Sequence, residues 1–332
     1  VVNSAKTVAE NLNDGSLVIL RSTVPVGTTR KIVKPILDKS GKSYHLAFCP
    51  ERTIEGKALT ELKELPQIIG GLDEDSVDKA QDLFRKITPT IIEVDSLESA
   101  EMVKLLNNTY RDLMFAYANE VAMICEKLNL DAVEVIKKAN LGYSRSNIPT
   151  PGFVGGACLE KDPHILVDMS KKEGYIPNLI KTGRDINENQ PAYVVEQIVN
   201  FLKDKEKEIA KSKILVSGFG FKGRPETDDT RGSLTLDLVK ELKKKGFENI
   251  CGHDFVISGE KLKEFDVVPC KLEEGFSDAD CVIIANNHES YLKIDIERLT
   301  TAMKEDSLIY DVWHLFYAKE MHKKVTHMGV GF

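Results

Sequence analysis

A cysteine stands in the part of the sequence best suited to covalent chemistry. The stretch Gly152-Phe-Val-Gly-Gly-Ala-Cys158 leads directly into Leu-Glu-Lys161-Asp162-Pro163. Glycine lets a backbone pass close to a ligand, and Asp162 before Pro163 predicts a helix start with Asp162 as the N-cap. A thiol just before a helix N-terminus and near Lys161 lies where its thiolate is favoured. The pattern predicts a nucleophile at Cys158; the alternative is an inert buried cysteine in a glycine-rich loop.

Three polar side chains share one face of a predicted helix. The pattern over residues 95–129 is typical of a single long helix, on which Lys104, Asn108 and Arg111 fall at positions i, i+4 and i+7. An amide and two cations on one face suit a polar sugar that carries a diphosphate. The alternative from periodicity alone is a solvated polar face.

Further polar residues follow predicted strands. Ser22 and Thr23 come after a strand at 17–20, and Glu51 follows a strand at 45–48. Ligands of open α/β sheets bind at the carboxyl ends of strands. The two hydroxyls could therefore reach a nicotinamide ribose or a catalytic water, and Glu51 could move a substrate proton. The alternative is an ordinary strand end followed by a helix cap at Thr28.

A second glycine-rich turn follows the predicted strand at 213–217. Its glycines, Gly218, Gly220 and Gly223, have the GxGxxG spacing, and Asp254 stands at the end of the next predicted strand. This pattern is typical of a dinucleotide site, in which the acid binds the ribose. A single GxGxxG is weak evidence on its own.

Five motifs together resemble the UDP-glucose/GDP-mannose dehydrogenase family. They occur in the family's order: Ser22–Thr29, Cys49–Gly56, Lys104–Asn108, Gly155–Asp162 and Thr227–Arg231. The resemblance covers essentially the whole chain. It implies an enzyme that oxidises a nucleotide-sugar alcohol twice, to a carboxylate, with two molecules of NAD and a cysteine thioester.

The resemblance assigns roles to individual residues. The implied catalytic residues are Cys158, Lys104, Asn108, Asp162 and Glu51. The implied NAD contacts are Ser22, Thr23, Glu55, Lys161 and Arg231. The implied nucleotide-sugar contacts are Arg52, Thr53, Lys104, Asn108, Arg111, Arg145, Gly152, Phe221 and Lys222. On this interpretation Gly218–Gly223 serves the UDP moiety, and no metal is required.

Arg52 indicates the class of sugar. An arginine after Pro-Glu51 resembles the branch of the family that oxidises UDP-N-acetyl-hexosamines such as UDP-N-acetylmannosamine. The alternatives are UDP-glucose 6-dehydrogenation, a one-step dehydrogenase of the 6-phosphogluconate type, and a non-catalytic nucleotide-sugar-binding dimer. Two features depart from relatives: the spacing from Lys222 to Arg231 is longer than in glucose-type members, and Trp313 and His314 stand where many relatives have an arginine.

Composition limits the partners and the compartment. The chain of 332 residues has a formal net charge of −7 and no basic stripe, which argues against nucleic acid. We expect no membrane segment, since no apolar run reaches spanning length. The six cysteines show no CxxC or Cys/His clustering, which argues against a zinc site or a disulfide framework. A cytoplasmic protein with reduced thiols is expected.

The resemblance and the alternation of predicted strands and helices indicate an α/β protein. We expect two Rossmann-like parallel-sheet domains, the first truncated, joined by a long central helix and a helical middle domain. The predicted domains are residues 1–95 for NAD, 96–205 for dimerisation and the catalytic loop, and 206–332 for UDP. A long unbroken helix also suits a homodimer. Because the family's NAD-binding βαβ unit is expected before residue 1, the chain is predicted to be a fragment, inactive alone.

Overall fold

The computed structural model describes residues 1–316 and 319–332. These residues form two compact units, the first made of residues 1–110 and 161–178, the second of residues 111–160 and 179–332. Each unit has its own sheet and its own hydrophobic clusters. The predicted division at residues 95 and 205 stays a prediction.

The first unit contains a four-stranded sheet in the order β1-β2-β3-β4. Its strands are β1 (Ser16–Leu20), β2 (Tyr44–Phe48), β3 (Gln67–Gly71) and β4 (Ile91–Glu93). The β1/β2 and β3/β4 pairs are parallel, and β2/β3 is antiparallel. The predicted strands at 17–20 and 45–48 are confirmed as β1 and β2. The apolar run Leu17–Leu20 predicts a buried strand, but β1 lies at the sheet edge and each of its residues is only half-buried.

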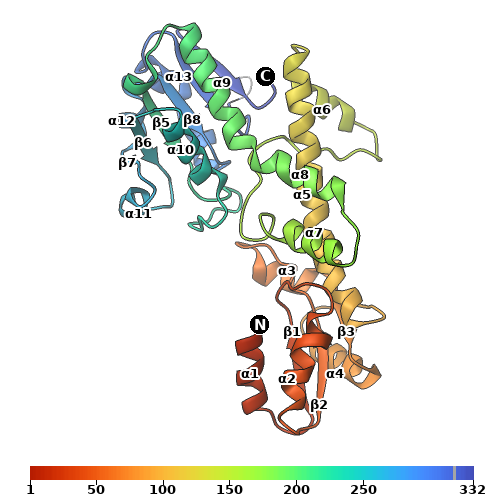
Figure 1. The fold of residues 1–332 in the computed structure, drawn as a ribbon. Coiled ribbons are helices and arrows are strands. Elements are labelled where there is room, and N and C mark those ends of the chain that lie inside the picture. Colours follow the sequence, from red (N-terminus) through yellow and green to blue (C-terminus); the bar gives the residue numbers. More distant parts are fainter. Residues whose placement is uncertain (317–318) are drawn as a thin grey trace. The chain divides into compact units, whose positions relative to one another are not determined.

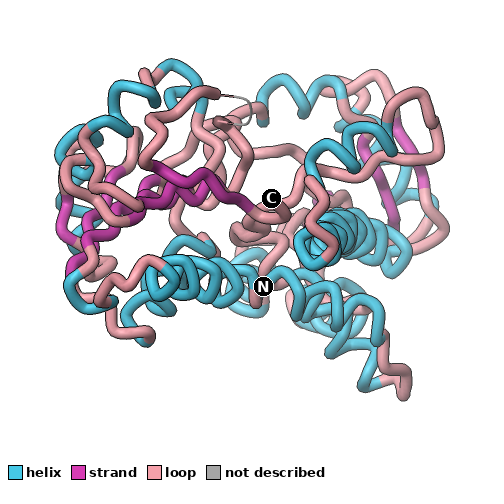
Figure 2. The backbone as a smooth tube through the Cα atoms, turned by 90° about the horizontal axis from the view of Figure 1, so that it is seen from above, coloured by secondary structure: helices cyan, strands magenta, loops and turns pink. Residues whose placement is uncertain are grey.

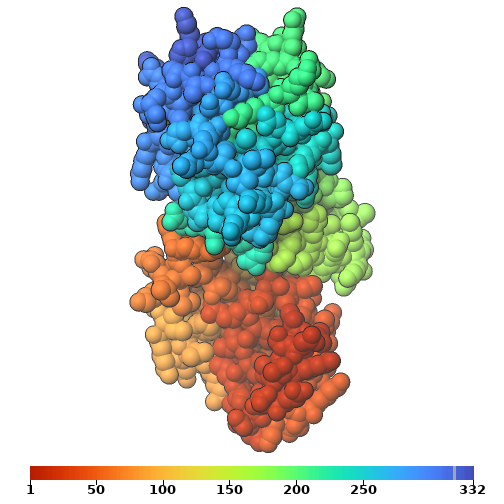
Figure 3. All heavy atoms as spheres, turned by 90° about the vertical axis from the view of Figure 1, so that its left-hand side faces the viewer, coloured from red at the N-terminus to blue at the C-terminus, as the bar shows by residue number. Residues whose placement is uncertain are grey.

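Helices cover both faces of this sheet. α1 (Val2–Glu10), the π-helix η1 (Thr29–Val33) and α2 (Lys34–Asp38) contribute to the cluster on one face, and α4 (Glu74–Phe84) contributes to the cluster on the other. The unit also contains α3 (Ala58–Glu64) and α7 (Asp162–Lys172). Along β2, Leu46 and Phe48 pack with α2 on one face, while Ala47 packs with α4 on the other. Alternate residues of a strand point to opposite faces, so this sheet is buried on both sides. The mostly exposed α1 is drawn in red in Figure 3.

One long helix, α5 (Leu97–Lys127), runs from the first unit into the second and is labelled in Figure 1. The predicted helix over 95–129 is thereby confirmed. Ser96 accepts a hydrogen bond from the Ser99 backbone N–H at 3.1 Å and so caps the helix start. A short helix, α6 (Ala132–Asn140), follows it.

The apolar pattern of residues 176–201 predicts a single helix, and this prediction is wrong. The structure has two helices there, α8 (Asn178–Glu188) and α9 (Gln190–Asp204), which are separated at Asn189. Pro191 lies in the first turn of α9. Proline has no N–H to donate and its ring clashes with the preceding turn, so it starts a helix more readily than it continues one.

The second unit contains a six-stranded parallel sheet in the order β10-β9-β8-β5-β6-β7. Its strands are β5 (Lys213–Ser217), β6 (Asn249–His253), β7 (Val268–Pro269), β8 (Cys281–Ile284), β9 (Ser307–Asp311) and β10 (Val325–Gly329). The chain reverses direction across the sheet between β5 and β8, as in a Rossmann fold. These strands are magenta in Figure 2.

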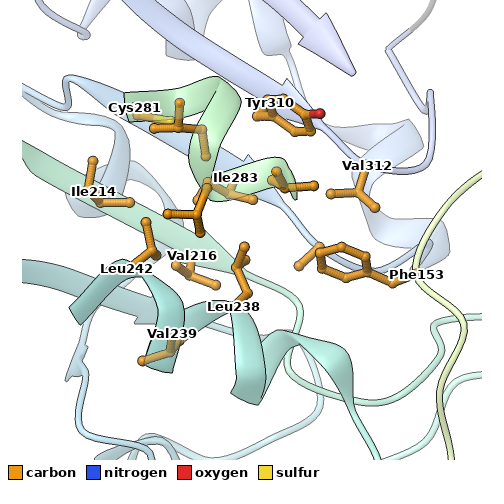
Figure 4. Close-up of a cluster of buried hydrophobic side chains, with 14 of the residues drawn as sticks. Phe153, Ile214, Val216, Leu238, Val239, Leu242, Cys281, Ile283, Tyr310 and Val312 are labelled. Carbon is orange, nitrogen blue, oxygen red and sulfur yellow. The ribbon is translucent and has the colours of Figure 1, made fainter. Parts of the chain in front are cut away.

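The remaining helices of this unit are α10 (Leu234–Lys244), α11 (Gly259–Lys263), α12 (Leu272–Phe276), α13 (Ile296–Thr301) and the 3-10 turns η2 (Ile209–Lys211) and η3 (Glu289–Lys293). Along β5, Ile214 and Val216 join one buried cluster while Leu215 joins another, so this sheet too is covered on both faces. Phe153, from the loop that carries Cys158, joins the first cluster with Leu238 and Val312 (Figure 4). The predicted α/β class with Rossmann-like sheets is confirmed.

Candidate active site

Cys158 lies exposed in a loop between α6 and α7, and residues 141–161 contain no helix or strand. The other five cysteines are buried or half-buried, and all six are free. Cys158 is therefore the thiol most open to an electrophile. The helix after the loop begins one residue earlier than predicted, at Asp162, with Lys161 as the N-cap. The carboxylate of Asp162 does not cap this helix, because other side chains bind it.

Those side chains form a polar cluster in the first unit. Asp162 has no exposed surface, and its Oδ2 accepts a hydrogen bond from Asn108 Nδ2 at 2.5 Å. Lys161 Nζ lies 2.7 Å from Asp162 Oδ1. Lys104 stands one turn before Asn108 on the same face of α5 and is half-buried. Two predicted catalytic residues, Asn108 and Asp162, are thus in direct contact, and Lys161, predicted to contact NAD, pairs with Asp162 as well.

Glu51 follows β2 and is held by two neighbours. Its Oε2 lies 2.8 Å from Arg21 Nη2, and its Oε1 accepts the Thr53 backbone N–H at 2.8 Å. Burial alone would raise the pKa of Glu51, but the hydrogen bond from Thr53 and the charge of Arg21 lower it overall. Glu51 is therefore a carboxylate at neutral pH, as a proton acceptor must be.

The Arg52 guanidinium donates a hydrogen bond to the carbonyl of Pro66, which directly precedes β3. Burial lowers the pKa of Arg52 below its usual value. Its predicted contact with the sugar stays a prediction, as does the role of Thr53.

The residues predicted to contact NAD include Ser22, exposed, and Thr23, half-buried, at the carboxyl end of β1. A cavity of about 230 Å³ opens beside Ser22, between β1 and α1. Glu55 is exposed in the loop after β2. Hydroxyl groups at a strand end beside a cavity fit the ribose and nicotinamide of NAD, so the residues present are suited to that end of the cofactor.

Glu101 binds the backbone of the loop that follows β1. Its role there was not predicted from the sequence. Its side chain is buried, and its carboxylate accepts hydrogen bonds from the N–H of Gly27 at 2.5 Å, the N–H of Thr29 at 2.8 Å and the Thr29 hydroxyl at 2.6 Å. Burial raises the pKa of Glu101. The signal was available in the sequence, because Glu101 lies between Leu97 and Leu105 on the apolar face of α5. Thr28 makes no capping hydrogen bond through its side chain.

The glycine-rich turn after β5 is filled by the chain itself. Asp254 accepts four backbone N–H groups, from Phe219, Gly220, Val256 and Ile257, at 2.6–3.3 Å. A Cβ on Gly223 would come within 2.1 Å of the His288 backbone nitrogen. The next helix, α10, begins only at Leu234. The turn thus lacks the adjacent helix N-terminus and the open acid of a dinucleotide site, which favours the UDP interpretation.

Three glycines of the cysteine loop pack against the rest of the second unit. An added Cβ would approach the Trp313 ring to 3.1 Å from Gly152, the Gly232 carbonyl oxygen to 2.1 Å from Gly155, and the Phe221 ring to 2.5 Å from Gly156. Phe221, predicted to contact substrate, thus packs on the cysteine loop, and Gly152 of that loop was predicted to contact substrate as well. Lys222 Nζ lies 5.2 Å from the centroid of the Phe221 ring.

Trp313 fills the place where the sequence departs from its relatives. Its indole Nε1 donates to the Ala285 carbonyl at 3.1 Å, and the ring lies against Gly152. Its position at the cysteine loop was not predicted from the sequence.

The remaining predicted cations lie on the surface. Arg111 and Arg145 are exposed, and the Arg145 guanidinium stacks over Tyr143 at 4.8 Å. Arg231 pairs with Asp229 at 2.7 Å, and its side chain is largely exposed. Their roles toward NAD or substrate stay predictions.

Across 1–316 and 319–332, no helix is both long and apolar enough to cross a membrane. Within the same ranges, no three side chains of His, Cys, Asp or Glu are grouped so that they could hold a metal ion.

Three domain models of one family match the chain. They describe the NAD binding domain, the central domain and the UDP binding domain of the UDP-glucose/GDP-mannose dehydrogenase family, and they match residues 1–88, 98–189 and 215–318. The match at 1–88 corrects one expectation: the prediction that the NAD-binding unit is lacking is not borne out.

Individual relatives agree with these matches. A UDP-N-acetyl-D-mannosamine dehydrogenase of Methanocaldococcus jannaschii is 36% identical over 96% of this chain and 72% of its own length. One of Campylobacter jejuni is 34% identical over 90% of this chain and 74% of its own.

A solved structure of a UDP-D-ManNAc dehydrogenase from Pyrococcus horikoshii superposes with a TM-score of 0.89 at 31% identity, covering 99% of this chain and 76% of that one. These matches include the NAD and UDP binding domains as well as the central domain. The chain therefore belongs to the UDP-glucose/GDP-mannose dehydrogenase family of NAD-dependent oxidoreductases.

Proposed function

We propose that this protein oxidises the C6 alcohol of a UDP-N-acetyl-hexosamine, UDP-N-acetylmannosamine first, to the uronate through a thioester on Cys158. The observation that carries the chemistry is the single exposed thiol on a loop packed against Phe221 and Gly232. The observation that favours this sugar is the name shared by the relatives, together with the Pro50-Glu51-Arg52 motif. NAD, when bound, accepts a hydride in each of the two oxidations.

The residues of this chain supply the remaining chemistry. Removal of the hydroxyl proton, assisted by Lys104 and Asp162 through water, accompanies the first oxidation to the aldehyde. The Cys158 thiolate attacks the aldehyde carbon to give a thiohemiacetal, whose oxidation leaves a thioester. Water hydrolyses the thioester, which releases the carboxylate and restores the thiol.

Glu51 acts as a proton acceptor in these steps, and Lys104 and Asn108 stabilise charge. Glu51, ionised at neutral pH, takes a proton from the attacking water. Lys104 and Asn108 stabilise the oxyanions that form on the sugar carbon. Asn108 already donates one of its amide hydrogens to Asp162 and has a second to offer.

We also propose a UDP site and a dimer, both supported by features of the second unit. Phe221 and Lys222 are proposed to hold the nucleotide beside the cysteine loop. Three large side chains are each more than half exposed: Tyr117 and Ile124 on α5, and Leu128 directly after it. Tyr117 and Ile124 lie seven residues apart on one stripe. We propose that a second copy covers this stripe, and light scattering on the purified protein measures the mass directly. Six free thiols suit a cytoplasmic location.

The test of the proposal compares substrates. Specificity constants are measured from NADH absorbance for UDP-N-acetylmannosamine, UDP-N-acetylglucosamine and UDP-glucose. The proposal expects the first to be highest, with two NADH formed per sugar consumed. A clear preference for UDP-glucose would contradict the assignment of the sugar. One NADH per sugar, with release of the aldehyde, would contradict the thioester pathway.

A further inference from the structure

A buried ion pair lies behind the cysteine loop in the second unit. Arg184 on α8 and Asp112 on α5 are each only 1% exposed, and Arg184 Nη1 lies 2.6 Å from Asp112 Oδ1. Removing two charges from water is costly, and the attraction between them offsets that cost only when further hydrogen bonds satisfy both groups. The other hydrogen-bond partners of Arg184 and Asp112 therefore indicate the structural role of this ion pair.

Two further hydrogen bonds from Arg184 reach the backbone of the cysteine loop, while its Nε lies 3.3 Å from Glu188 Oε1 on the same helix. Nη1 also donates to the Leu159 carbonyl at 2.9 Å, and Nη2 donates to the Val154 carbonyl at 3.1 Å. These carbonyls lie on either side of Cys158 in the chain. Because the loop has no regular secondary structure, its buried carbonyls need partners from side chains.

A second side chain holds the start of the same loop. Asn119 on α5 is fully buried; it accepts the Gly152 N–H at 2.8 Å and donates to the Gly152 carbonyl at 3.1 Å. Asn187 on α8 joins the two anchors, since it accepts from Asn119 at 2.9 Å and donates to Asp112 at 2.9 Å. One continuous buried network thus connects α5, α8 and the loop at Gly152, Val154 and Leu159.

We infer that Arg184 is a positioning residue for the reaction: held by Asp112, its guanidinium fixes the loop backbone on both sides of Cys158 and thereby sets the approach of the sulfur to the aldehyde carbon. This inference rests on the proposed nucleophilic role of Cys158. Arginine suits the task because its planar fork donates in several fixed directions at once, whereas a lysine ammonium is a point charge on a flexible stem.

The key variant is Arg184→Lys. It keeps a positive charge beside Asp112 but loses the fixed fork to the two loop carbonyls. We expect kcat to fall about 10- to 100-fold, the size of effect that a small misplacement of a reacting group produces. The dissociation constant for UDP should stay within about twofold, because the residues proposed to hold the nucleotide, Phe221 and Lys222, do not bond to Arg184. Lys181→Met is the matched control, since Lys181 makes an exposed ion pair with Asp185 on the same helix.

A second variant removes both charges of the pair, so that poor folding caused by an unpaired buried charge is avoided. The double change Arg184→Met with Asp112→Asn leaves no lone buried charge and keeps an acceptor for Asn187. It should show the same loss of kcat with UDP affinity kept. The rate of Cys158 alkylation by iodoacetamide, followed on the Cys158 peptide by mass spectrometry from neutral to alkaline pH, should differ from the parent by about threefold or more in both variants. A purely structural role would leave this rate unchanged in a folded variant.

The outcomes separate the inference from the proposed function. If Cys158→Ser still produces uronate at the parent rate, the proposed function fails. If Cys158→Ser is inactive but a folded Arg184→Lys or the folded double variant keeps the parent kcat and alkylation rate, the positioning role is wrong. If UDP affinity falls in step with kcat, the network supports the unit as a whole and the inference is again wrong.

Discussion

The ring of Phe221 lies against Gly156, two residues before Cys158. A Cβ on Gly156 would come within 2.5 Å of Phe221 Cδ2, and Gly156 has a φ of +95°. Glycine is thus required here twice, by backbone conformation and by space. The contact ties the loop proposed to hold the nucleotide to the loop proposed to hold the nucleophile.

This contact predicts that Gly156→Ala impairs both substrate binding and turnover. The added methyl group must displace Phe221 or the loop, so KM for the UDP-sugar should rise and kcat should fall. The matched control is Gly246→Ala, where φ is +91° and no atom lies within 4 Å of the added Cβ. In both variants, alanine in a left-handed conformation should cost about 1–2 kcal/mol of stability. Urea unfolding of each variant would measure this cost. Equal kinetics in the two variants would show that the Phe221 contact is unimportant.

Cys158→Ser is expected to abolish uronate formation while UDP-sugar binding persists. A serine hydroxyl has almost no anion at neutral pH, so no thioester forms. Product analysis by mass spectrometry and titration calorimetry with UDP-sugar measure the two properties separately. Cys270→Ser, which changes a half-buried thiol after β7, is the control and should remain active. Uronate production by the Cys158→Ser enzyme at the parent rate is the contrary result.

Asn108→Asp is expected to destabilise the protein increasingly as pH rises. It places a second carboxyl against buried Asp162, so one of the two must keep a proton and its folded pKa is raised. A raised folded pKa gives stability that is present below the unfolded value, about 4, and is lost as pH rises through the folded value. Unfolding free energies at pH 5 and pH 8 test this. Asn107→Asp, at the exposed neighbouring position, should show no such trend.

His314 predicts part of the acid sensitivity of the second unit. Burial lowers the pKa of His314 from 6.5 to about 4, despite the opposing charges of Asp311 and Asp131. The unfolded chain therefore binds a proton first, so stability is full above about pH 6.5 and is lost as pH falls toward 4, by about 3 kcal/mol. His314→Phe should flatten the unfolding free energy over this range. An unchanged slope would mean that other groups cause the acid sensitivity.

The sequence allowed the elements and their order to be predicted, because hydrophobic periodicity is a local property. The break between two helices at Asn189 was not predicted. Pro191 indicates a helix start there, but the apolar pattern continues across it. Within the site, Asn108 and Asp162 were predicted together from family motifs and are in contact. Arg184 and Asp112 were not predicted, because each would read as a surface charge and only the folded chain shows that they pair.

The glycine-rich turn after β5 gives a criterion for recognising true dinucleotide sites in other sequences. GxGxxG and a downstream acid occur here although Asp254 already binds four backbone N–H groups of its own chain. Ten residues separate Gly223 from the start of α10 at Leu234, whereas a dinucleotide turn opens directly into its helix. A motif search that also required a short distance from the last glycine to the next predicted helix would have rejected this false match.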